Sequence, residues 1–439
     1  MSVSANGSIP AAVQALAAAD FSDLAQRFAA AGLLVSTPCP GVLQVLQPHP
    51  AHGKQHGAER ILLPSGASDD DGHGKERILM PSGLKDDKDH GTERILMPSG
   101  ATDPYNPDGK HPQPRILMPS GATDPYNPDG KHPQPRGEAA LGEQSPAHAA
   151  ALPDIDLTPS VLLSVGVHGD ETGPIEVLAH LLDQLASEPH ALKVNLLLVV
   201  GNVDAIAAGK RFIDADLNRM FKRERGDLAG TKEAVRADQM MAATTAFFAN
   251  KGPHRWHLDL HTAIRPSFYP AFAIVPLIIA DAARHRLMDW LGDAGIQALI
   301  MNPKSAGTYS YFTCEQCSAA GSTVELGRVG VLGQNDLTQF AAASSALNGL
   351  LRNDASLIPQ GEKAEIFLMA QEIMKLSDSF KMAFGKETQN FTALKQGELI
   401  AEDGETRYVV QHGEEYVVFP NPNVRVGQRA GLMVVKQGA

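Results

Sequence analysis

Outside residues 47–150, the apolar positions of the chain fall into short runs with two different spacings. Segments that are apolar on both faces, or that alternate strictly, have the pattern of strands; these are 41–46, 161–167, 193–200, 256–260 and 322–326. Segments with apolar residues three and four apart have the pattern of helices; these are 11–31, 171–185, 237–250, 281–291 and 337–351. Strands that alternate with helices predict an α/β fold with a mixed, largely parallel sheet flanked by helices.

The pattern of apolar and polar residues changes near residue 365. From there, short runs in which apolar and polar residues alternate are separated by Gly-rich turns, as in ELIAEDGETRYVVQHGEEYVVFPNP. This pattern is typical of antiparallel strands joined by hairpins. We therefore expect an α/β domain formed by residues 1–46 and 151–360, followed by a smaller all-β C-terminal domain at 361–439.

Residues 47–150 form an insert with a composition of its own. They hold 15 of the 30 prolines and eight of the 16 histidines, and the motif RILMPSG or RILLPSG recurs four times. Each repeat offers only three large apolar residues, too few to offset the entropy of ordering the chain. The prediction is a disordered low-complexity insert; a partner-binding array or a histidine-rich metal-binding tract are the alternatives.

The charge and the cysteine content narrow the class of protein. A net charge of −12 and the lack of a long basic block argue against a nucleic-acid partner. Residues 271–283 are the candidate apolar run, but they fall short of the ~20 residues that span a bilayer. No secretory signal pattern begins the chain, and three cysteines do not make a disulfide framework. We expect a cytoplasmic protein without a membrane partner, and its oligomeric state stays open.

His-x-x-Glu, in which both side chains can reach one metal ion, occurs five times in the chain. Three copies begin at His56, His73 and His90 inside the repeats, and a fourth at His412 in a hairpin turn. Only the copy at His168 and Glu171 follows a buried strand and precedes a helix, the position where open α/β sheets bind ligands. The alternative is a polar turn that caps the helix.

A catalytic zinc ion needs a third protein ligand and an open position. His261, at the end of the strand in WHLDLHTA, is the candidate, with Asp259 as a neighbour of unknown geometry. A buried core histidine is the alternative.

Glu325 in STVELGRVG is a carboxylate inside an apolar strand. Burying a carboxylate there costs free energy, which is unusual unless the group has a function. It is the candidate proton acceptor for an attacking water; a buried ion pair with an arginine is the alternative.

The loop 210–221 (KRFIDADLNRMF) gathers Arg211, Asn218, Arg219 and two aspartates in one segment. Arginine can grip a carboxylate through two parallel hydrogen bonds, so the cluster suits a small anionic substrate. A solvated charged loop is the alternative, but its interleaved Phe and Leu residues favour a loop that is anchored.

These motifs together, HGDETGPIE, KRFIDADLNRMF, RWHLDLHTAIR and VELG, resemble the aspartoacylase-type branch of the zinc carboxypeptidase-like family. The resemblance covers 41–46, about 160–350 and the C-terminal part; the insert departs from it. It implies one zinc ion on His168, Glu171 and His261, with Glu325 as the catalytic acid and base. It further implies that Arg211 polarises the scissile carbonyl and that Asn218 and Arg219 hold a substrate carboxylate.

DLHTAIR favours the family members that hydrolyse N-succinyl-L-glutamate to succinate and L-glutamate, the last step of arginine catabolism by the succinyltransferase pathway. Other functions stay open at this stage. A deacylase of another N-acyl amino acid, such as N-acetyl-aspartate, differs only in the shape of the pocket. A peptidase is less well matched by the compact anionic loop, and a non-catalytic protein that binds partners through its repeats is the third alternative.

Overall fold

The computed structural model describes residues 9–48, 155–305, 307–385 and 387–438. The prediction of a disordered insert at 47–150 therefore lies outside the described residues, apart from Gln47 and Pro48. Within the described ranges, no helix is both long enough and apolar enough to cross a membrane.

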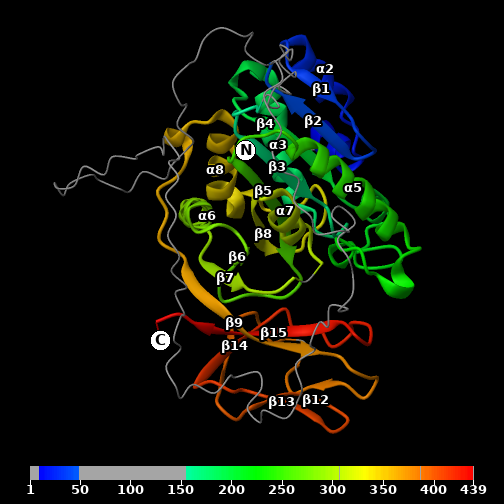
Figure 1. Ribbon diagram of the computed structural model, residues 1–439, viewed down its shortest axis with the longest axis vertical. Coiled ribbons are helices and arrows are strands. Elements are labelled where there is room, and N and C mark those ends of the chain that lie inside the picture. Colours follow the sequence, from blue (N-terminus) through cyan, green and yellow to red (C-terminus); the bar gives the residue numbers. More distant parts are fainter. Residues whose placement is uncertain (1–8, 49–154, 306, 386, 439) are drawn as a thin grey trace, which may run out of the picture. The chain divides into compact units, whose positions relative to one another are not determined.

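A sheet that runs through the described ranges organises the fold (Figure 1). Its strand order is β1-β2-β4-β3-β5-β8-β6-β7-β9-β15-β14-β11. β3, β4, β5 and β8 pair in parallel at its centre, while β1 and β2 are added antiparallel at one edge. The strands of this α/β part are β1 Leu34–Ser36, β2 Val42–Leu46, β3 Ser160–Val165, β4 Asn195–Val200, β5 Arg255–Ala263, β6 Ala271–Pro276, β7 Ala298–Asn302 and β8 Ala320–Arg328. The predicted α/β class is confirmed.

Helices cover both faces of this sheet, and the central strands β3 and β4 have apolar side chains on both sides. One buried cluster joins α1, α2, α3, α6 and α8 to the sheet, and a second joins α5 and α7 to the other face. Their bounds are α1 Ala11–Ala17, α2 Ser22–Ala30, α3 Gly173–Ser187, α4 Val203–Ala207, α5 Lys232–Phe248, α6 Asp281–Asp293, α7 Tyr309–Cys317 and α8 Ala341–Arg352; 3-10 turns are Pro189–Ala191, Leu217–Arg219, Gly226–Leu228, Leu337–Phe340 and Ala355–Leu357.

The prediction of one helix over residues 11–31 is wrong. The segment forms two helices, and Ala19 between them has a φ of 54°, in the left-handed region. An alanine is strained there, but the turn lets Val13, Leu16 and Phe28 all enter the same core. Burial of these side chains outweighs the local preference for a continuous helix.

The C-terminal part is all-β, as predicted. Its strands are β9 Glu365–Met374, β10 Lys381–Met382, β11 Thr392–Lys395, β12 Leu399–Asp403, β13 Thr406–Val409, β14 Glu414–Val418 and β15 Arg429–Lys436. β9 pairs in parallel with β7 and antiparallel with β15, so the main sheet continues into this part (Figure 1). β10, β12 and β13 form a separate small sheet. The domain boundaries at 46, 150 and 360 stay a prediction.

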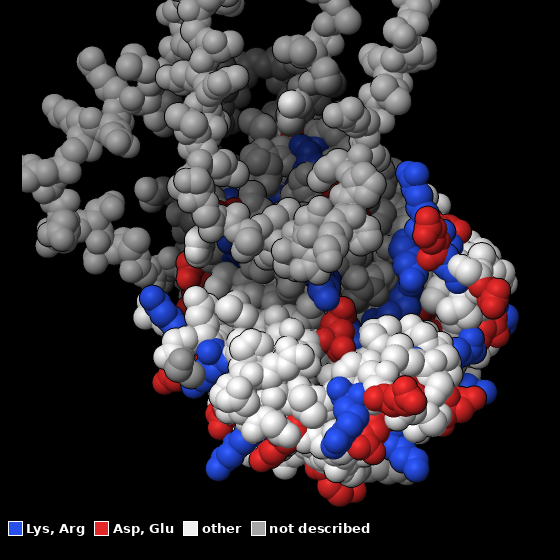
Figure 2. Space-filling view, turned by 60° about the horizontal axis from the view of Figure 1, so that its bottom comes forward, with Lys and Arg blue, Asp and Glu red and all other residues white. Residues whose placement is uncertain are grey.

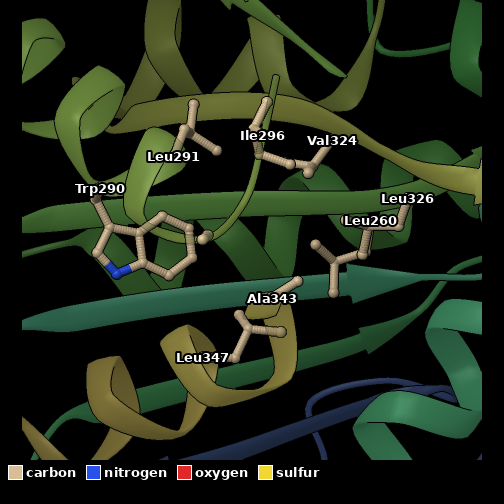
Figure 3. A pocket seen from close by; sticks show the side chains of 9 residues that line it. Leu260, Trp290, Leu291, Ile296, Val324, Leu326, Ala343 and Leu347 are labelled. Atoms are coloured by element: carbon tan, nitrogen blue, oxygen red, sulfur yellow. The ribbon is translucent and has the colours of Figure 1, made fainter. Parts of the chain in front are cut away.

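Two neighbouring strands, β5 and β8, differ sharply between their faces. Leu260 on β5 and Val324 and Leu326 on β8 point into an apolar cavity of about 10 Å³, closed by Trp290, Leu291 and Leu347 (Figure 3). The alternate positions on the same strands, His261 and Glu325, belong to the opposite face, because side chains of a strand alternate in direction. β5 and β8 thus have apolar side chains on one face and ionisable side chains on the other.

Candidate metal centre

The turn after β3 brings His168 and Glu171 together. Gly166 has a φ of 64°, in the left-handed region that glycine adopts without strain, and the chain turns sharply there. Helix α3 begins at Gly173 and not at Glu171 as predicted, and Pro174 occupies its first turn. Glu171 is therefore a turn residue whose side chain is free to point away from the helix, toward His168.

His261 completes a compact, buried set of three possible ligands. One ligand atom from each of His168, Glu171 and His261 lies within 4.8 Å of the others, and all three side chains are buried. The Nδ1 atom of His168 lies 2.8 Å from Glu171 Oε1, and that of His261 lies 2.8 Å from Glu171 Oε2. Both imidazoles thus turn the same ring nitrogen toward one point beside the carboxylate.

The other ring nitrogen of each histidine faces a second carboxylate. Nε2 of His168 lies 2.9 Å from Asp216 Oδ1, and Nε2 of His261 lies 3.0 Å from Asp259 Oδ2. A carboxylate that holds Nε2–H leaves Nδ1 as the nitrogen that can bind a metal once it has lost its own proton, and histidine ligands of metals are usually held in this way. The arrangement is therefore that of a metal site with its outer hydrogen bonds in place.

The electrostatics of the set show why it is charged although buried. Burial opposes the charged form of His261, but the carboxylates of Asp259 and Glu171 outweigh burial and raise its pKa well above the usual value. Burial alone would raise the pKa of Glu171, whereas His168 and His261 hold it well below its ordinary value. A buried cluster of this kind is stable only when its charges are matched, by protons or by a metal ion.

Glu325 stands next to this set on the neighbouring strand. It is the register partner of His261 in the parallel pair of β5 and β8. Burial and the charge of Glu171 raise its pKa to about 7, and its Oε2 atom has no hydrogen-bond partner. The alternative of a buried Arg–Glu ion pair at Glu325 finds no support among the described contacts. A carboxylate poised near neutral pH with a free oxygen is suited to accept a proton.

The loop 210–221 delivers three further candidates. Arg211 donates from Nη1 to Glu171 Oε1 at 2.8 Å, and its Nη2 lies 3.1 Å from His168 Nε2, so its guanidinium borders Glu171 and His168. Asn218 is buried, and its Oδ1 accepts a hydrogen bond from the Tyr309 backbone N–H. Arg219 donates to the carbonyl of Asn218 at 2.7 Å. The loop is therefore anchored, as its Phe and Leu residues led us to expect.

A residue that we did not single out from the sequence, Glu233, holds this loop in place. Its fully buried carboxylate accepts hydrogen bonds from the backbone N–H groups of Ile213, Asp214 and Ala215, and from the side chain of Asn202. The sequence contains no local signal for this role, because a glutamate in the first turn of a helix is common. Only the fold shows that α5 begins beside the loop.

The remaining candidates from the sequence do not form comparable sites. His412 and Glu415 do contact each other at 2.9 Å, but the histidine side chain is 55% exposed, and no third ligand joins them in the part of the chain that the structure describes. The copies at His56, His73 and His90 lie outside the described residues. Cys314 is buried on α7, and burial raises the pKa of its thiol to about 12, which disfavours the thiolate that a metal would need.

Comparisons with known proteins show which family the chain resembles. The family model described as "Succinylglutamate desuccinylase/Aspartoacylase catalytic domain" matches residues 157–351, and "AstE/AspA barrel-sandwich hybrid domain" matches residues 362–437. A succinylglutamate desuccinylase of Burkholderia orbicola (strain MC0-3) is 43% identical over 304 residues, covering 67% of this chain and 86% of that protein. One of Burkholderia lata is 45% identical over 278 residues, covering 63% and 79%.

Solved structures show the same fold. The crystal structure of succinylglutamate desuccinylase from Vibrio cholerae is 33% identical with a TM-score of 0.60, covering 64% of this chain and 82% of its own. That from Chromobacterium violaceum is 36% identical with a TM-score of 0.56, covering 64% and 85%.

A helix-covered, centrally parallel sheet with a buried His-Glu-His set at the carboxyl ends of its central strands defines an α/β protein with a candidate metal centre. The matches to both domain models and to full-length relatives make the assignment specific: the chain belongs to the succinylglutamate desuccinylase/aspartoacylase family.

Proposed function

We propose that this protein is a zinc-dependent hydrolase that cleaves the amide bond of N-succinyl-L-glutamate, releasing succinate and L-glutamate. The observation that supports this most directly is the buried set of His168, Glu171 and His261 with the unpartnered Glu325 carboxylate beside it. Relatives that align over most of their length are named for the same reaction. In a cell the reaction would end arginine catabolism by the succinyltransferase pathway, in the cytoplasm.

The residues present fit zinc. Two imidazole nitrogens and one carboxylate oxygen, with each imidazole held from behind by an aspartate, form the donor set of many catalytic zinc sites. His168, Glu171 and His261 would hold the ion. When bound, zinc supplies Lewis-acid polarisation of the attacking water and of the scissile carbonyl.

Glu325 is the group that moves the proton. Hydrolysis adds water across the C–N bond, so the water loses one proton as its oxygen bonds to carbon, and the nitrogen must gain one before it leaves. The carboxylate of Glu325 accepts the first proton and returns it to the departing amine. A pKa near 7 suits both steps, because the group can exist in either form at neutral pH.

Arg211 is placed to stabilise negative charge on the carbonyl oxygen, because its guanidinium borders both His168 and Glu171. Each preorganised donor of this kind is worth roughly 3 kcal/mol of barrier in enzymes where one has been removed. Its contact with Glu171 also keeps the guanidinium beside the ligands, where the charge develops.

Asn218 and Arg219 would bind a carboxylate of the substrate, and the surrounding charge favours a polyanion. Arg429 on β15 is part of this environment: burial, and then the nearby positive charge of Arg219, lower its pKa to about 10. It is only partly balanced by Glu372, whose Oε1 lies 3.2 Å from Arg429 Nη1. Two arginines that repel each other gain stability from an anion, and N-succinylglutamate carries three carboxylates.

The experiment compares hydrolysis of N-succinyl-L-glutamate, N-acetyl-L-glutamate and N-acetyl-L-aspartate by the purified, zinc-loaded protein. We expect kcat/KM for the succinyl substrate to exceed the others by at least about tenfold, since the unused anion-binding groups penalise a shorter acyl chain. Removing zinc with a chelator should abolish activity, and zinc should restore it. A preference for N-acetyl-L-aspartate would instead place the protein with the aspartoacylases. Full zinc occupancy without hydrolysis of any of the three would overturn the proposal.

A further inference from the structure

A line of buried polar side chains runs from the candidate metal centre into the core and is not needed for the chemistry proposed above. It begins at Asp259, continues through Ser164 on β3 and His257 on β5, and ends at Thr313 on α7. Ser164 Oγ lies 2.6 Å from Asp259 Oδ1 and 2.8 Å from His257 Nε2, and His257 Nδ1 lies 2.8 Å from Thr313 Oγ1. All four residues are fully buried.

The strand register explains how the line forms. Ser164 and Asp259 are direct partners in the parallel pair of β3 and β5. His257, Asp259 and His261 are alternate residues of β5 and therefore share one face, opposite Trp256, Leu258 and Leu260, which belong to the main apolar cluster. Buried polar groups are expensive, so a row of them on a central strand calls for a reason beyond packing.

The hydrogen atoms of this line can be assigned by elimination. Asp259 is placed to accept, because its Oδ1 lies 2.6 Å from the Ser164 hydroxyl, which is the donor of this contact. The single hydroxyl hydrogen of Ser164 must then go to Asp259 Oδ1, and Ser164 Oγ must accept from His257 Nε2–H. Burial lowers the pKa of His257 to about 4, so the ring is neutral and its Nδ1 is bare. That nitrogen lies 2.8 Å from Thr313 Oγ1, and the Thr313 hydroxyl also lies 2.8 Å from the Ser310 carbonyl.

The two hydrogen bonds nearest the carboxylate therefore point toward Asp259: from His257 to Ser164, and from Ser164 to the carboxylate. On its other oxygen, Asp259 has His261 Nε2 at 3.0 Å. A carboxylate that already receives one strong hydrogen bond stays charged and acts only as an acceptor for the histidine. We propose that Ser164 and His257 are positioning residues that hold Asp259 as an acceptor, and so hold His261 with its Nδ1 lone pair directed at the metal.

This inference rests on the zinc site of the proposed function, but its test does not depend on hydrolysis. The zinc affinity of the full-length protein is measured by competition with a chelator for Ser164→Ala and His257→Leu. We expect each variant to bind zinc about 10- to 100-fold more weakly, the usual effect of losing a partner of a metal-binding histidine. His257→Gln, whose side-chain amide can still donate to Ser164, should recover most of the affinity.

The unfolding free energy of the zinc-free protein distinguishes a positioning role from a merely structural one. Ser322→Ala is the matched control: Ser322 is a fully buried serine on β8 that donates to the Ile274 carbonyl. It should lower stability as Ser164→Ala does while zinc affinity stays unchanged. If Ser164→Ala or His257→Leu does not fold, Thr313→Val takes its place, because it removes only the hydroxyl group at the outer end of the line. We expect this variant to lose zinc affinity several-fold. Zinc affinities within twofold of wild type, whatever the change in stability, would overturn the inference.

The two proposals fail in different ways. A wild-type protein that binds zinc but hydrolyses no acylated amino acid would remove the proposed function and leave this inference standing. A wild-type protein that binds zinc and hydrolyses N-succinylglutamate, with variants of unchanged zinc affinity, would do the reverse.

Discussion

At the scale of single residues, Glu325 shows how burial sets chemistry. Its side chain is 6% exposed, on a strand whose neighbouring residues are apolar, and its pKa of about 7 follows from that burial and from the charge of Glu171. The same glutamate on the surface would be ionised at any physiological pH and would be a poor proton donor to a leaving amine.

Replacing Glu325 with glutamine should separate zinc binding from turnover. The amide keeps the shape but cannot take up a proton, so we expect kcat to fall by roughly 10²- to 10⁴-fold. The zinc content should stay the same, because no ligand is lost. Metal analysis and steady-state kinetics on one preparation check this, with His261→Ala as the variant that should lose both. Near-normal turnover would show that another group moves the proton.

The pH dependence of stability offers a second test at Glu325. A folded-state pKa raised to about 7 favours the neutral carboxyl in the native protein, so this contribution to stability is complete below pH ~4.5 and is lost as pH rises through 7. In zinc-free protein, wild type should therefore lose stability relative to Glu325→Gln between pH 5 and pH 8, by up to about 3 kcal/mol. Urea unfolding of both proteins at the two pH values measures the difference. A constant gap would mean that the carboxyl has an ordinary pKa.

At the scale of elements, most strands and helices follow from the apolar pattern, and the failures have physical causes. Helix α7 has buried residues around most of its circumference, so no amphipathic period marks it, and its Ser, Thr and Cys residues are weak helix formers. The apolar pattern does not predict β7, and it marks 271–283 only as an apolar run too short to span a membrane, although this run contains β6. A short continuous apolar run has no helical or alternating periodicity, so its sequence alone does not distinguish a strand from a helix.

The site was predictable to the extent that its residues lie next to strand ends. His168, Glu171, His261 and Glu325 each follow or occupy a recognisable strand, so their convergence could be expected. Asp216 as a partner of His168, and the line through Ser164 and His257, could not. Their contacts join residues 48 to 95 positions apart, and they depend on a strand register and on the path of a loop.

The anchoring of the loop by Glu233 leads to a prediction at this scale. Glu233→Gln replaces a carboxylate oxygen with an NH₂ group that faces backbone N–H donors, which should cost roughly 1–3 kcal/mol of stability. Because the loop carries Arg211 and Arg219, we also expect KM for N-succinylglutamate to rise. Glu224→Gln, at an exposed position nearby, is the control and should change neither quantity. Thermal melting and steady-state kinetics test both; an unchanged KM in a destabilised variant would mean that the loop keeps its shape without this anchor.

At the scale of the whole molecule, the sheet continues from the α/β part into the C-terminal strands, and Arg425 Nη2 donates to the Asp214 carbonyl at 2.8 Å. The C-terminal part thus contacts the loop that carries the proposed substrate-binding residues. The face in Figure 2 shows Lys and Arg side chains interspersed with Asp and Glu. The part of this face that is not grey therefore carries both signs of charge and not a broad field of one sign.

Deleting residues 51–150 should leave a folded, zinc-loaded and active enzyme. None of the residues proposed for chemistry lies in the insert, which connects β2, ending at Leu46, to β3, beginning at Ser160. Lengthening such a connection from about 10 to about 110 residues costs only roughly 2 kcal/mol of closure entropy. Zinc content, melting temperature and hydrolysis of N-succinylglutamate are measured on the deletion variant. Loss of folded protein, or an activity drop beyond about tenfold, would show that the repeats take part in the working structure.

The place of β2 in the sheet has a consequence for how the chain could be divided. Among the described residues, β2 pairs with β1 and β4 alone, through a ladder from Val42 to Val45 in the second pair and the burial of Leu43 and Val45. The next described strand, β3, lies beyond β4. The attachment of β2 is therefore of the kind by which a separate peptide adds itself to a sheet edge. Residues 9–48 are therefore, in energetic terms, a segment docked onto the rest of the α/β part, through this strand and through the burial of Val13, Leu16 and Phe28.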